Sequence, residues 1–459
     1  MRPFRPRGWL LLGFGALALL LAWVLGRRDL LAVAVFCCAL PVVAGAGLYW
    51  LKHGFSVKRS FSPALAQVGR PVSVTLDVRG HAHGGEQMRL MEELPVSFHD
   101  LPRFNHPNPV VPRGLLSRYH YQLHPSRRGI FTIGPLTAEF ADPFDVAFLQ
   151  RSLDTGDMLA VAPAAVGLPT ISIADGRGRD GTRSTSELAH ASADDAMTRE
   201  YHYGDPLRRV HWPGTARQGK LMVRAEESVT APEAALVLDR RAFAFGQPSG
   251  GPGLPSLRTT AVFESAVVAA MSIATHLLDV GYTVRILDHA GQPAFASSSS
   301  ALEGNTVDFN GTHGALEVAA ALAALELALP VPGAGAPSAR PRATGLPATG
   351  LPATGPPATG ERDFGDAVAH KLHRGRRGGP LVAVTGLLSL DEARLLAGTA
   401  DASQTACALV LCKEPEQAAE ALTILHSAGW QAVALPKGMP LAEAWLQFDR
   451  HGHSVVRQS

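Results

Sequence analysis

Two long uncharged apolar stretches open the chain. Residues 9–26 form an 18-residue run and residues 30–51 a 22-residue run, joined only by the short polar sequence Arg27-Arg28-Asp29. A helix of about 20 apolar residues crosses the roughly 30 Å hydrocarbon layer of a bilayer. A cleaved signal peptide would account for the first run, but it leaves the second unexplained, and no small-residue cleavage site separates the two. Residues 1–53 are therefore predicted to form a two-helix transmembrane hairpin.

Basic residues near the ends of the spans predict how the hairpin is oriented. The outer ends carry six of them, whereas the turn carries two, Arg27 and Arg28; the six are Arg2, Arg5, Arg7, Lys52, Lys58 and Arg59. The side of a membrane protein that is richer in Lys and Arg faces the cytoplasm. Both termini and everything after residue 51 are predicted to be cytoplasmic.

The pattern changes to strict alternation of apolar and polar residues after the hairpin. It is clearest over residues 72–78, 119–123 and 130–140, with Gly and Pro between the runs. Alternation with a period of two is typical of half-buried antiparallel strands. A small β-sandwich is predicted over residues 54–165.

Near-continuous apolar segments alternate with amphipathic ones from residue 232 to residue 459. The strand candidates are 234–239, 282–288, 380–385, 406–411 and 430–435, and the helix candidates are 262–278, 315–329, 390–399, 416–428 and 441–448. Strands that are apolar on both faces and alternate with helices indicate a mostly parallel sheet covered on both sides. The predicted fold class is thus a doubly wound α/β domain plus the small β-sandwich, behind the hairpin.

Two segments lack such patterns. Within the linker, residues 166–231, Gly176, Gly178 and Gly181 have the spacing of a dinucleotide-binding loop, but no apolar helical face follows them, so a loop is the better interpretation. Residues 331–362 hold three tandem units of the type ATGLP or ATGPP. A tract without large apolar residues cannot offset its ordering entropy, so a disordered insertion is predicted, with a Pro-rich partner ligand as the alternative.

Composition and the absence of known motifs exclude several classes of function. The 42 basic and 40 acidic residues leave a net charge of +2, which argues against a nucleic-acid-binding protein. The four cysteines cannot form a disulfide framework. The chain has no G-x-S-x-G, H-E-x-x-H or Walker loop, and its histidines lack ligand-spaced companions. We therefore expect no catalytic site, no cofactor and no metal.

Polar and aromatic residues are concentrated between the two predicted domains. The nine residues of this cluster are Arg199, Tyr201, Asp205, Arg208, Arg209, His211, Trp212, Arg217 and Lys220. Gly204-Asp205-Pro206 predicts a turn, from which Asp205 pairs with Arg208 or Arg217. Trp212 is expected to pack as an amphipathic anchor.

This segment resembles the motif R-x-Y-x-x-G-D-x-x-R-x-x-H-W-x-x-x-A-R of the domain of unknown function 58 family. The matching residues are Arg199, Tyr201, Gly204, Asp205, Arg208, His211, Trp212, Ala216 and Arg217. Residues 127–144 and 263–287 are similar to further parts of that family, whereas Pro213 and Thr215 stand where members often have Lys and Ser. The resemblance implies a bacterial membrane protein that works with a MoxR-type AAA+ ATPase.

The resemblance also implies a von Willebrand factor A-like fold for the α/β domain. Such domains hold a divalent cation through a D-x-S-x-S loop after their first strand. Asp239 stands at that place, but Arg240, Arg241, Ala242 and Phe243 follow it, so both serines are missing. We expect this degenerate position to hold no metal.

Three interpretations of the motif remain open: an ion-paired junction between domains, a docking surface for a partner, and a catalytic or phosphate-binding site. We favour a membrane-anchored, non-enzymatic interaction or adaptor protein that works with a MoxR-type ATPase in the assembly or maturation of protein complexes or in envelope functions. The alternative is a hydrolase or phosphate-binding protein that uses Asp205, Arg208 and His211. The lipid bilayer, through residues 9–51, is the other expected partner, and nucleic acid is not.

Overall fold

The chain folds into two units, residues 1–164 and 165–459. The structure is a computed structural model, and it describes residues 4–50, 54–80, 88–98, 102–106, 116–142, 144–171, 198–201, 210, 212–224, 232–246, 257–328, 368, 371–372 and 379–455. Gly204, Asp205, Arg208 and His211, together with the repeat insertion 331–362, lie outside these residues.

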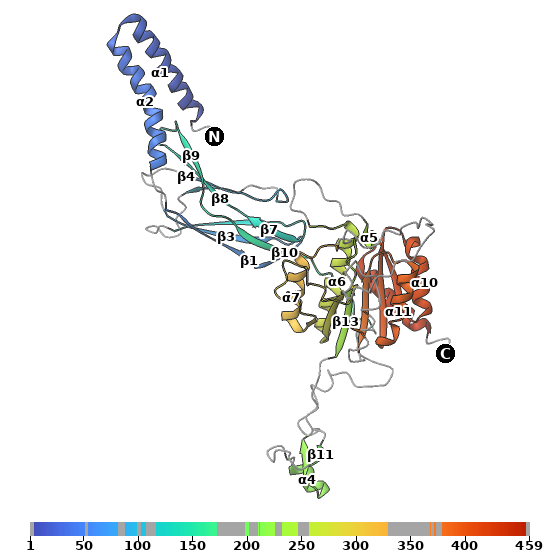
Figure 1. The fold of residues 1–459 in the computed structure, drawn as a ribbon. Helices are drawn as coiled ribbons and strands as arrows, with labels where there is room; N and C mark the ends of the chain where they lie inside the picture. Colours follow the sequence, from blue (N-terminus) through green and yellow to red (C-terminus); the bar gives the residue numbers. More distant parts are fainter. Residues whose placement is uncertain are drawn as a thin grey trace, which may run out of the picture. The chain divides into compact units, whose positions relative to one another are not determined.

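The first unit begins with the apolar hairpin (Figure 1). Helix α1 (Pro6–Leu25) ends at Gly26, whose φ of 63° lets the chain turn into α2 (Arg28–Trp50). The helices pack closely at Gly15, where a Cβ would come within 2.5 Å of Cys38 Sγ. The outward side chains are apolar and exposed, as at Leu10 and Trp23. Both helices are long and apolar enough to cross a membrane.

A third helix has the length and apolarity of a span, but it lies in the second unit. In α6 (Ala261–Val280), 67% of the most apolar 18-residue stretch is buried inside the protein. The corresponding stretches of α1 and α2 are only 22% and 17% buried. Packing within its own unit therefore explains the apolarity of α6. The orientation of the hairpin stays a prediction.

Layered β-sheets follow the hairpin in the first unit. The strands are β1 (Ser56–Ser62), β2 (Leu65–Gln67), β3 (Val72–Arg79), β4 (Met88–Glu92), β5 (Arg103–His106), β6 (Leu116–Leu123), β7 (Gly129–Ile133), β8 (Leu136–Ala141), β9 (Phe148–Ser152) and β10 (Asp157–Ala162). They form sheets ordered β1-β3-β6, β5-β4-β8-β9 and β2-β10-β7. All the pairings are antiparallel except that of β2 with β10.

The sheet β1-β3-β6 is the shared layer of this arrangement. The half of β3 with Leu76 and Val78 packs on β4 and β8, and the half with Val72 and Val74 packs on β7 and β10. Alternate residues of β3 are buried, because successive side chains of a strand point to opposite faces. The predicted run 130–140 is two strands, since the Gly134-Pro135 peptide divides it into β7 and β8.

The second unit contains a mixed six-stranded sheet, which confirms the α/β prediction. Its order is β15-β14-β13-β16-β17-β18. The parallel strands are β13 (Glu233–Leu238), β14 (Thr283–Asp288), β16 (Pro380–Thr385), β17 (Thr405–Cys412) and β18 (Gln431–Pro436). The two-residue β15 (Asp308–Phe309), which the pattern is too short to predict, pairs antiparallel with β14.

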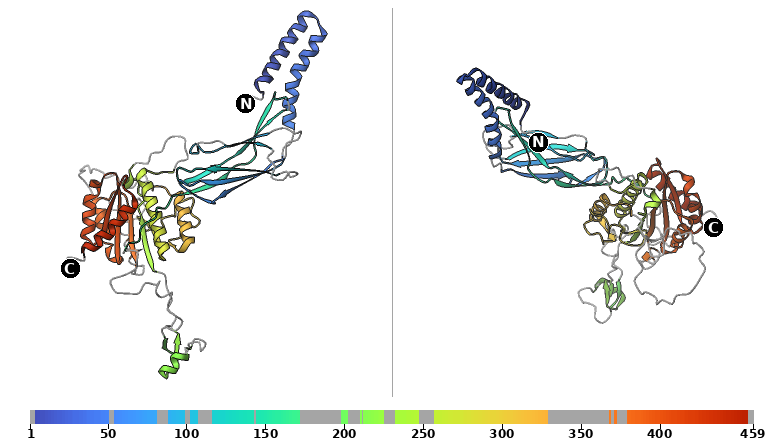
Figure 2. Two further views of the ribbon diagram at one scale, coloured as in Figure 1. Left: turned by 180° about the vertical axis from the view of Figure 1, so that it is seen from behind. Right: turned by 45° about the horizontal axis from the view of Figure 1, so that its top comes forward.

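Helices cover both faces of this sheet (Figures 1 and 2). Besides α6, they are α5 (Ala242–Phe245), α7 (Gly311–Ala323), α9 (Leu390–Ala397), α10 (Ala419–Ser427) and α11 (Leu441–Val455), with short 3₁₀ turns at Ala400–Ala402 and Pro415–Ala418. Helix α7 packs on α6, and α9 packs on α10. Trp445 of α11 meets His276 of α6 edge-on at a ring distance of 5.7 Å.

Helix α7 ends earlier than its apolar pattern predicts. The pattern continues to residue 329, but the helix stops at Ala323. Beyond it, the Ala328 amide donates to the Arg240 carbonyl at 2.7 Å, and the Ala242 amide donates to the Ala328 carbonyl at 3.2 Å. The residues after α7 therefore pair with the segment after β13. Their backbone hydrogen bonds to that segment replace the bonds that a longer helix would have made.

Candidate functional site

The motif segment folds locally as strand, helix and strand. Strand β11 (Thr198–Glu200) contains Arg199 and pairs antiparallel with β12 (Met222–Arg224). Between them, α4 (Trp212–Gln218) contains Trp212 and Arg217. The Tyr201 amide donates to the Leu221 carbonyl at 2.8 Å, and the Met222 amide donates to Thr215 Oγ1 at 3.0 Å. Five of the matching motif residues are thus on one small folded segment: Arg199, Tyr201, Trp212, Ala216 and Arg217.

Trp212 differs from its expected role as a packed anchor. It begins α4 and is 67% exposed, and Arg217, on the last turn of the same helix, is exposed as well. These two residues of α4 give one short helix both a large exposed apolar surface and an exposed, charged hydrogen-bond donor. These two residue types are enriched among the side chains that contribute most to protein–protein binding.

The structure places a second polar cluster at the carboxyl end of the parallel sheet. Asp239 directly follows β13, and its neighbour in the sheet, β16, connects to α9, which contains Glu392. The chain runs from β13 to β14 on one side and returns to β16 on the other, so this is the switch point of the strand order. Open α/β sheets bind ligands outside the carboxyl ends of their strands at such a point.

Arg241 fills this place with its own side chain. Its Nε and Nη2 donate to the two oxygens of Asp239, both at 2.9 Å, and its Nη1 donates to Glu392 Oε1. The side chains of Asp239 and Arg241 are completely buried. Burial by itself lowers the pKa of an arginine, but the hydrogen bonds and charge of Asp239, with Glu392, outweigh it and raise the pKa of Arg241. The result is a permanently charged, buried ion triad.

Local geometry explains why both carboxylates point at Arg241. The Arg241 amide donates to Asp239 Oδ1 at 3.0 Å, which holds the Asp239 side chain across its own turn. Glu392 belongs to the capping box of α9: its Oε2 accepts from the Ser389 amide at 2.8 Å, which leaves Oε1 for Arg241. The ring of Phe243 covers the guanidinium, 4.6 Å away, and is itself 59% exposed.

Arg240 points into a different network. Its Nε donates to the Glu326 carbonyl and its Nη1 to the Ala294 carbonyl, each at 3.2 Å, while Nη2 donates to Ser297 Oγ. Burial lowers the pKa of Arg240. The three bonds hold the loop after β14 and the end of the α7 segment against β13.

A buried histidine lies beside the triad. His289 Nδ1 is 3.9 Å from Asp239 Oδ1, too far for a hydrogen bond, and the residue is 6% exposed. Burial lowers the pKa of His289 in spite of the nearby Asp239 and Asp288 carboxylates. The imidazole is therefore neutral at pH 7 and adds no positive charge to the cluster.

The donor set at Asp239 does not fit a divalent cation. Such a cation needs several free carboxylate or hydroxyl oxygens, but Arg241 occupies both oxygens of Asp239 and one oxygen of Glu392. Among the residues that the structure describes, no group of three or more His, Cys, Asp and Glu side chains is arranged to hold a metal. The guanidinium therefore takes the oxygens that a cation at this place would need.

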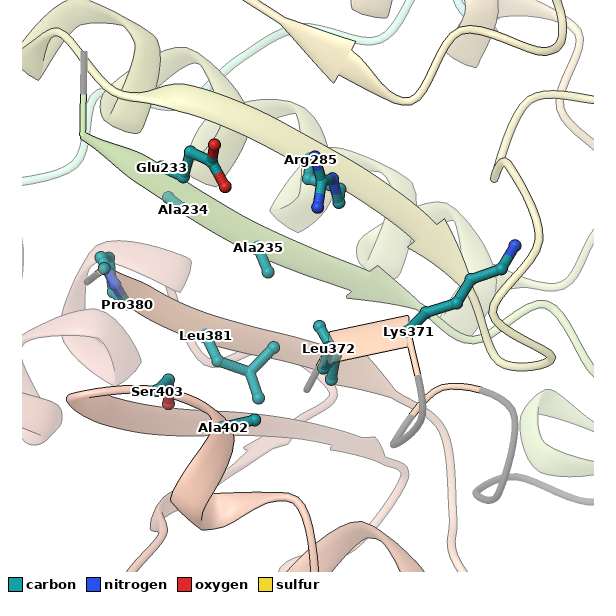
Figure 3. Close-up of a pocket in the computed structure, with 11 residues that line it drawn as sticks. Glu233, Ala234, Ala235, Arg285, Lys371, Leu372, Pro380, Leu381, Ala402 and Ser403 are labelled. Carbon is teal, nitrogen blue, oxygen red and sulfur yellow. The ribbon is translucent and has the colours of Figure 1, made fainter. Parts of the chain in front are cut away.

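A small depression lies at the opposite end of the same strands (Figure 3). Its charged lining residues are Glu233, Arg285 and Lys371, and the rest is mostly Ala, Leu, Gly and Pro. Arg285 donates to both oxygens of Asp308, at 2.7 and 3.0 Å. Such a lining suits the start of two buried strands, and the charge of Arg285 within it is paired with Asp308.

Glu392 is the member of the triad that sequence reasoning missed. The pattern Ser389-x-x-Glu392 before an apolar run predicts a capping box, which the structure contains. It does not predict the contact with Arg241, which lies 151 positions away in the chain.

Comparisons with known proteins give no family. No family model matches the chain, and no curated protein matches it. Solved structures match only in part. The CARDB domain of a Pyrococcus furiosus protein, solved with di-metal ions, is 11% identical over 24% of this chain and 88% of its own, with a TM-score of 0.17. The alkylpurine DNA glycosylase AlkC of Pseudomonas fluorescens is 8% identical over 29% and 38%, with a TM-score of 0.16. A β-glucosidase from Listeria innocua is 12% identical over 25% and 16%, with a TM-score of 0.13. Similarity this low carries no functional argument.

Proposed function

We propose that the chain is a membrane-anchored, non-enzymatic adaptor whose motif segment docks a partner protein. The observation that carries the proposal is the exposed pair Trp212 and Arg217 on α4, displayed by a segment with its own backbone hydrogen bonds. Burial of this tryptophan against a partner would favour binding, because apolar surface lowers its free energy when it leaves water.

The partner class comes from the resemblance of residues 199–217 to the domain of unknown function 58 family. It implies a MoxR-type AAA+ ATPase, and it implies a von Willebrand factor A-like fold for the α/β unit. The two apolar helices α1 and α2 support the membrane anchor. An ATP-dependent partner requires the soluble units to face the cytoplasm, as the positive charges near the span ends also favour.

The ion triad supports a binding role over a catalytic one for the α/β unit. The switch point of an open α/β sheet is the usual ligand site, and here Arg241 closes it with two bonds to Asp239. The fully buried, ion-paired side chain of Arg241 occupies this site and contributes to the stability of the α/β unit. The activity of the protein is therefore proposed to lie in its surfaces.

Binding of the full-length protein in nanodiscs to a purified MoxR-type ATPase from the same organism tests the proposal. We expect Trp212→Ala to weaken binding at least tenfold, a loss of about 1.4 kcal/mol or more, as for a central interface aromatic. Arg217→Ala is expected to weaken binding in the same direction. Affinity is measured by biolayer interferometry with and without ATP.

Two variants elsewhere in the α/β unit serve as matched controls. Leu316→Ala on α7 removes an apolar side chain that is 61% exposed, and Arg394→Ala on α9 removes an arginine whose side chain is 65% exposed. Neither change should alter the affinity. Equal losses in all four variants, or unchanged binding in Trp212→Ala, would contradict docking by the motif segment.

A further inference from the structure

The foot of the hairpin is locked to the turn between β8 and β9. The Phe4 backbone bridges to Ala147, and the Arg5 amide donates to the Val146 carbonyl at 2.9 Å. A Cβ at Gly8, in the first turn of α1, would lie 2.5 Å from the same carbonyl oxygen. The turn therefore touches the helix at the level where its apolar span begins.

Charges at this foot are paired within the protein. Arg5 bonds to Glu139 at 2.5 Å and to Asp145 at 2.6 Å, and Arg7 lies 3.6 Å from Asp145. Carboxylates beside a bilayer are repelled by anionic headgroups and resist transfer from water. The two arginines offset both of these carboxylates, which lets the turn lie against a membrane surface.

The turn has a fixed shape that leaves one aromatic ring outside. Asp142 is buried, and its side chain accepts from the amides of Phe144 and Ala147, each at 2.7 Å. Asp145 takes a left-handed conformation with a φ of 55°, which reverses the chain. Phe144 lies between them with 61% of its surface exposed, although apolar side chains around it in sequence, such as Val146, are buried.

We propose that Phe144 inserts into the interfacial layer of the bilayer, beside the point where α1 enters it. The proposal rests on the hairpin spanning the membrane, which is part of the proposed function. The occupant is lipid because the turn that carries the exposed ring contacts the start of α1: Val146 contacts Gly8, and Trp9 and Leu10 follow on α1 with 54% and 73% exposed. Phe is among the side chains by which interfacial segments bury their apolar side at the boundary between headgroups and acyl chains.

A third contact has a mechanical consequence for the first unit. Two helices that leave the membrane side by side allow the attached sheets to tilt about the line that joins them. An inserted ring adds a further attachment to the bilayer, because moving it out would return apolar surface to water.

Nitroxide accessibility in the full-length protein tests the proposal. The four native cysteines are changed to alanine, one cysteine is introduced by Phe144→Cys and spin-labelled, and the protein is reconstituted into phosphatidylcholine–phosphatidylglycerol liposomes. Collision with lipid-soluble oxygen and with a water-soluble nickel chelate is measured by power saturation. Circular dichroism of each labelled protein verifies the fold.

Two further positions make the result decisive. Leu17→Cys probes an outward residue of α1 that is 56% exposed, and Val96→Cys probes an exposed apolar residue (79%) beyond the Glu92 end of β4. Because Leu136 pairs with Glu92 in the sheet, Val96 lies at the end away from the β8–β9 turn. It is the matched control for an exposed apolar side chain of the same unit.

We expect the oxygen-to-nickel ratio at position 144 to exceed that at position 96 several-fold and to approach that at position 17. A water-like ratio at position 144 with a lipid-like ratio at position 17 overturns this inference and leaves the membrane anchor intact. A water-like ratio at position 17 overturns the anchor itself and, with it, the insertion of Phe144.

Discussion

Arg241 joins two carboxylates that come from different parts of the α/β unit. Its guanidinium bonds to Asp239, after β13, and to Glu392, on α9. The guanidinium offsets one of the two carboxylate charges in a place where both the Asp239 and Arg241 side chains are fully buried. Buried charges are tolerated only when they are paired and hydrogen-bonded. The carboxylates therefore depend on Arg241 more than on any solvent contact.

Removal of this one cation should destabilise the α/β unit strongly. We expect Arg241→Met to lower its free energy of unfolding by about 3–5 kcal/mol, because the substitution keeps much of the packing and leaves two buried carboxylates without their partner. Urea unfolding followed by far-UV circular dichroism measures the change. Arg394→Met is the matched control: its ion pair with Asp391 is on the surface of α9, where such pairs contribute about 0–1 kcal/mol. Similar, small effects of both variants would contradict the role of the triad.

Strands from three sheets of the first unit meet at Arg59. This residue of β1 donates from Nε to Glu92 Oε1 at 2.8 Å, and from Nη1 to Asp154 at 2.9 Å and to Asp157 at 2.6 Å. Glu92 ends β4, and Asp157 begins β10. Three carboxylates thus share one guanidinium, so the cluster as a whole is acidic.

This surplus of carboxylates affects the titration of Glu92. Burial of its completely covered side chain raises the pKa, and the negative charges of Asp154 and Asp157 add to this, so that the pKa lies at about 7 in spite of Arg59. The ordinary value is 4.5. At a pH between 4.5 and about 7, Glu92 is therefore protonated in the folded unit and ionised in the unfolded chain.

The stability of the first unit should consequently fall as the pH rises from about 4.5 to about 7. A carboxyl group whose pKa is raised by folding stabilises the fold most at pH values below its pKa in the unfolded chain. Between the two pKa values, the free energy of unfolding falls by up to about 1.4 kcal/mol per pH unit. We expect Glu92→Gln to flatten this slope, since the amide keeps an acceptor for Arg59 and does not titrate. Chemical unfolding at a series of pH values from 4 to 8 measures it.

Glu93→Gln is the matched control for this measurement. Glu93 is the next residue in the chain, and its Oε1 accepts from Thr137 Oγ1 at 3.2 Å. The control should retain the slope of the unchanged protein. A slope that persists in Glu92→Gln would show that another group causes it.

At the scale of elements, local patterns predicted the type of most segments and misplaced some of their ends. The β16 strand and the start of α9 lie where the apolar pattern places them. The run 130–140 is divided by Gly134-Pro135. Helix α7 ends at Ala323, before its predicted end, and Ala328 pairs with the backbone after β13. Periodicity reports which face is apolar, whereas an element's end depends on which backbone groups find distant partners.

The whole molecule has two units with separate apolar cores. One core joins β3, β4, β6 and β8 in residues 1–164, and another joins β13, β16 and β17 with α9 and α10 in residues 165–459. The Arg59 cluster belongs to the first unit, and the Arg241 triad belongs to the second. Domains with their own cores can unfold independently.

Scanning calorimetry of the full-length protein in detergent should therefore resolve two transitions. We expect Arg241→Met to lower the midpoint of the transition of residues 165–459 and to leave the other transition unchanged. Glu92→Gln should change only the transition of residues 1–164. The pH dependence between 4.5 and 7 should appear in the same transition as the Glu92→Gln effect. A single transition shifted by both variants would mean that the two units unfold together.

The sequence by itself determined the two apolar helices, the alternating strands and the α/β pattern, because each of these follows from neighbouring residues. Only the tertiary structure decided that Glu392 completes the Arg241 triad, that Arg59 joins three carboxylates, and that the β8–β9 turn lies against α1. These contacts join residues 33 to 151 positions apart in the chain. Local spacing contains no information on such pairs, since they are fixed by how the sheets and helices pack.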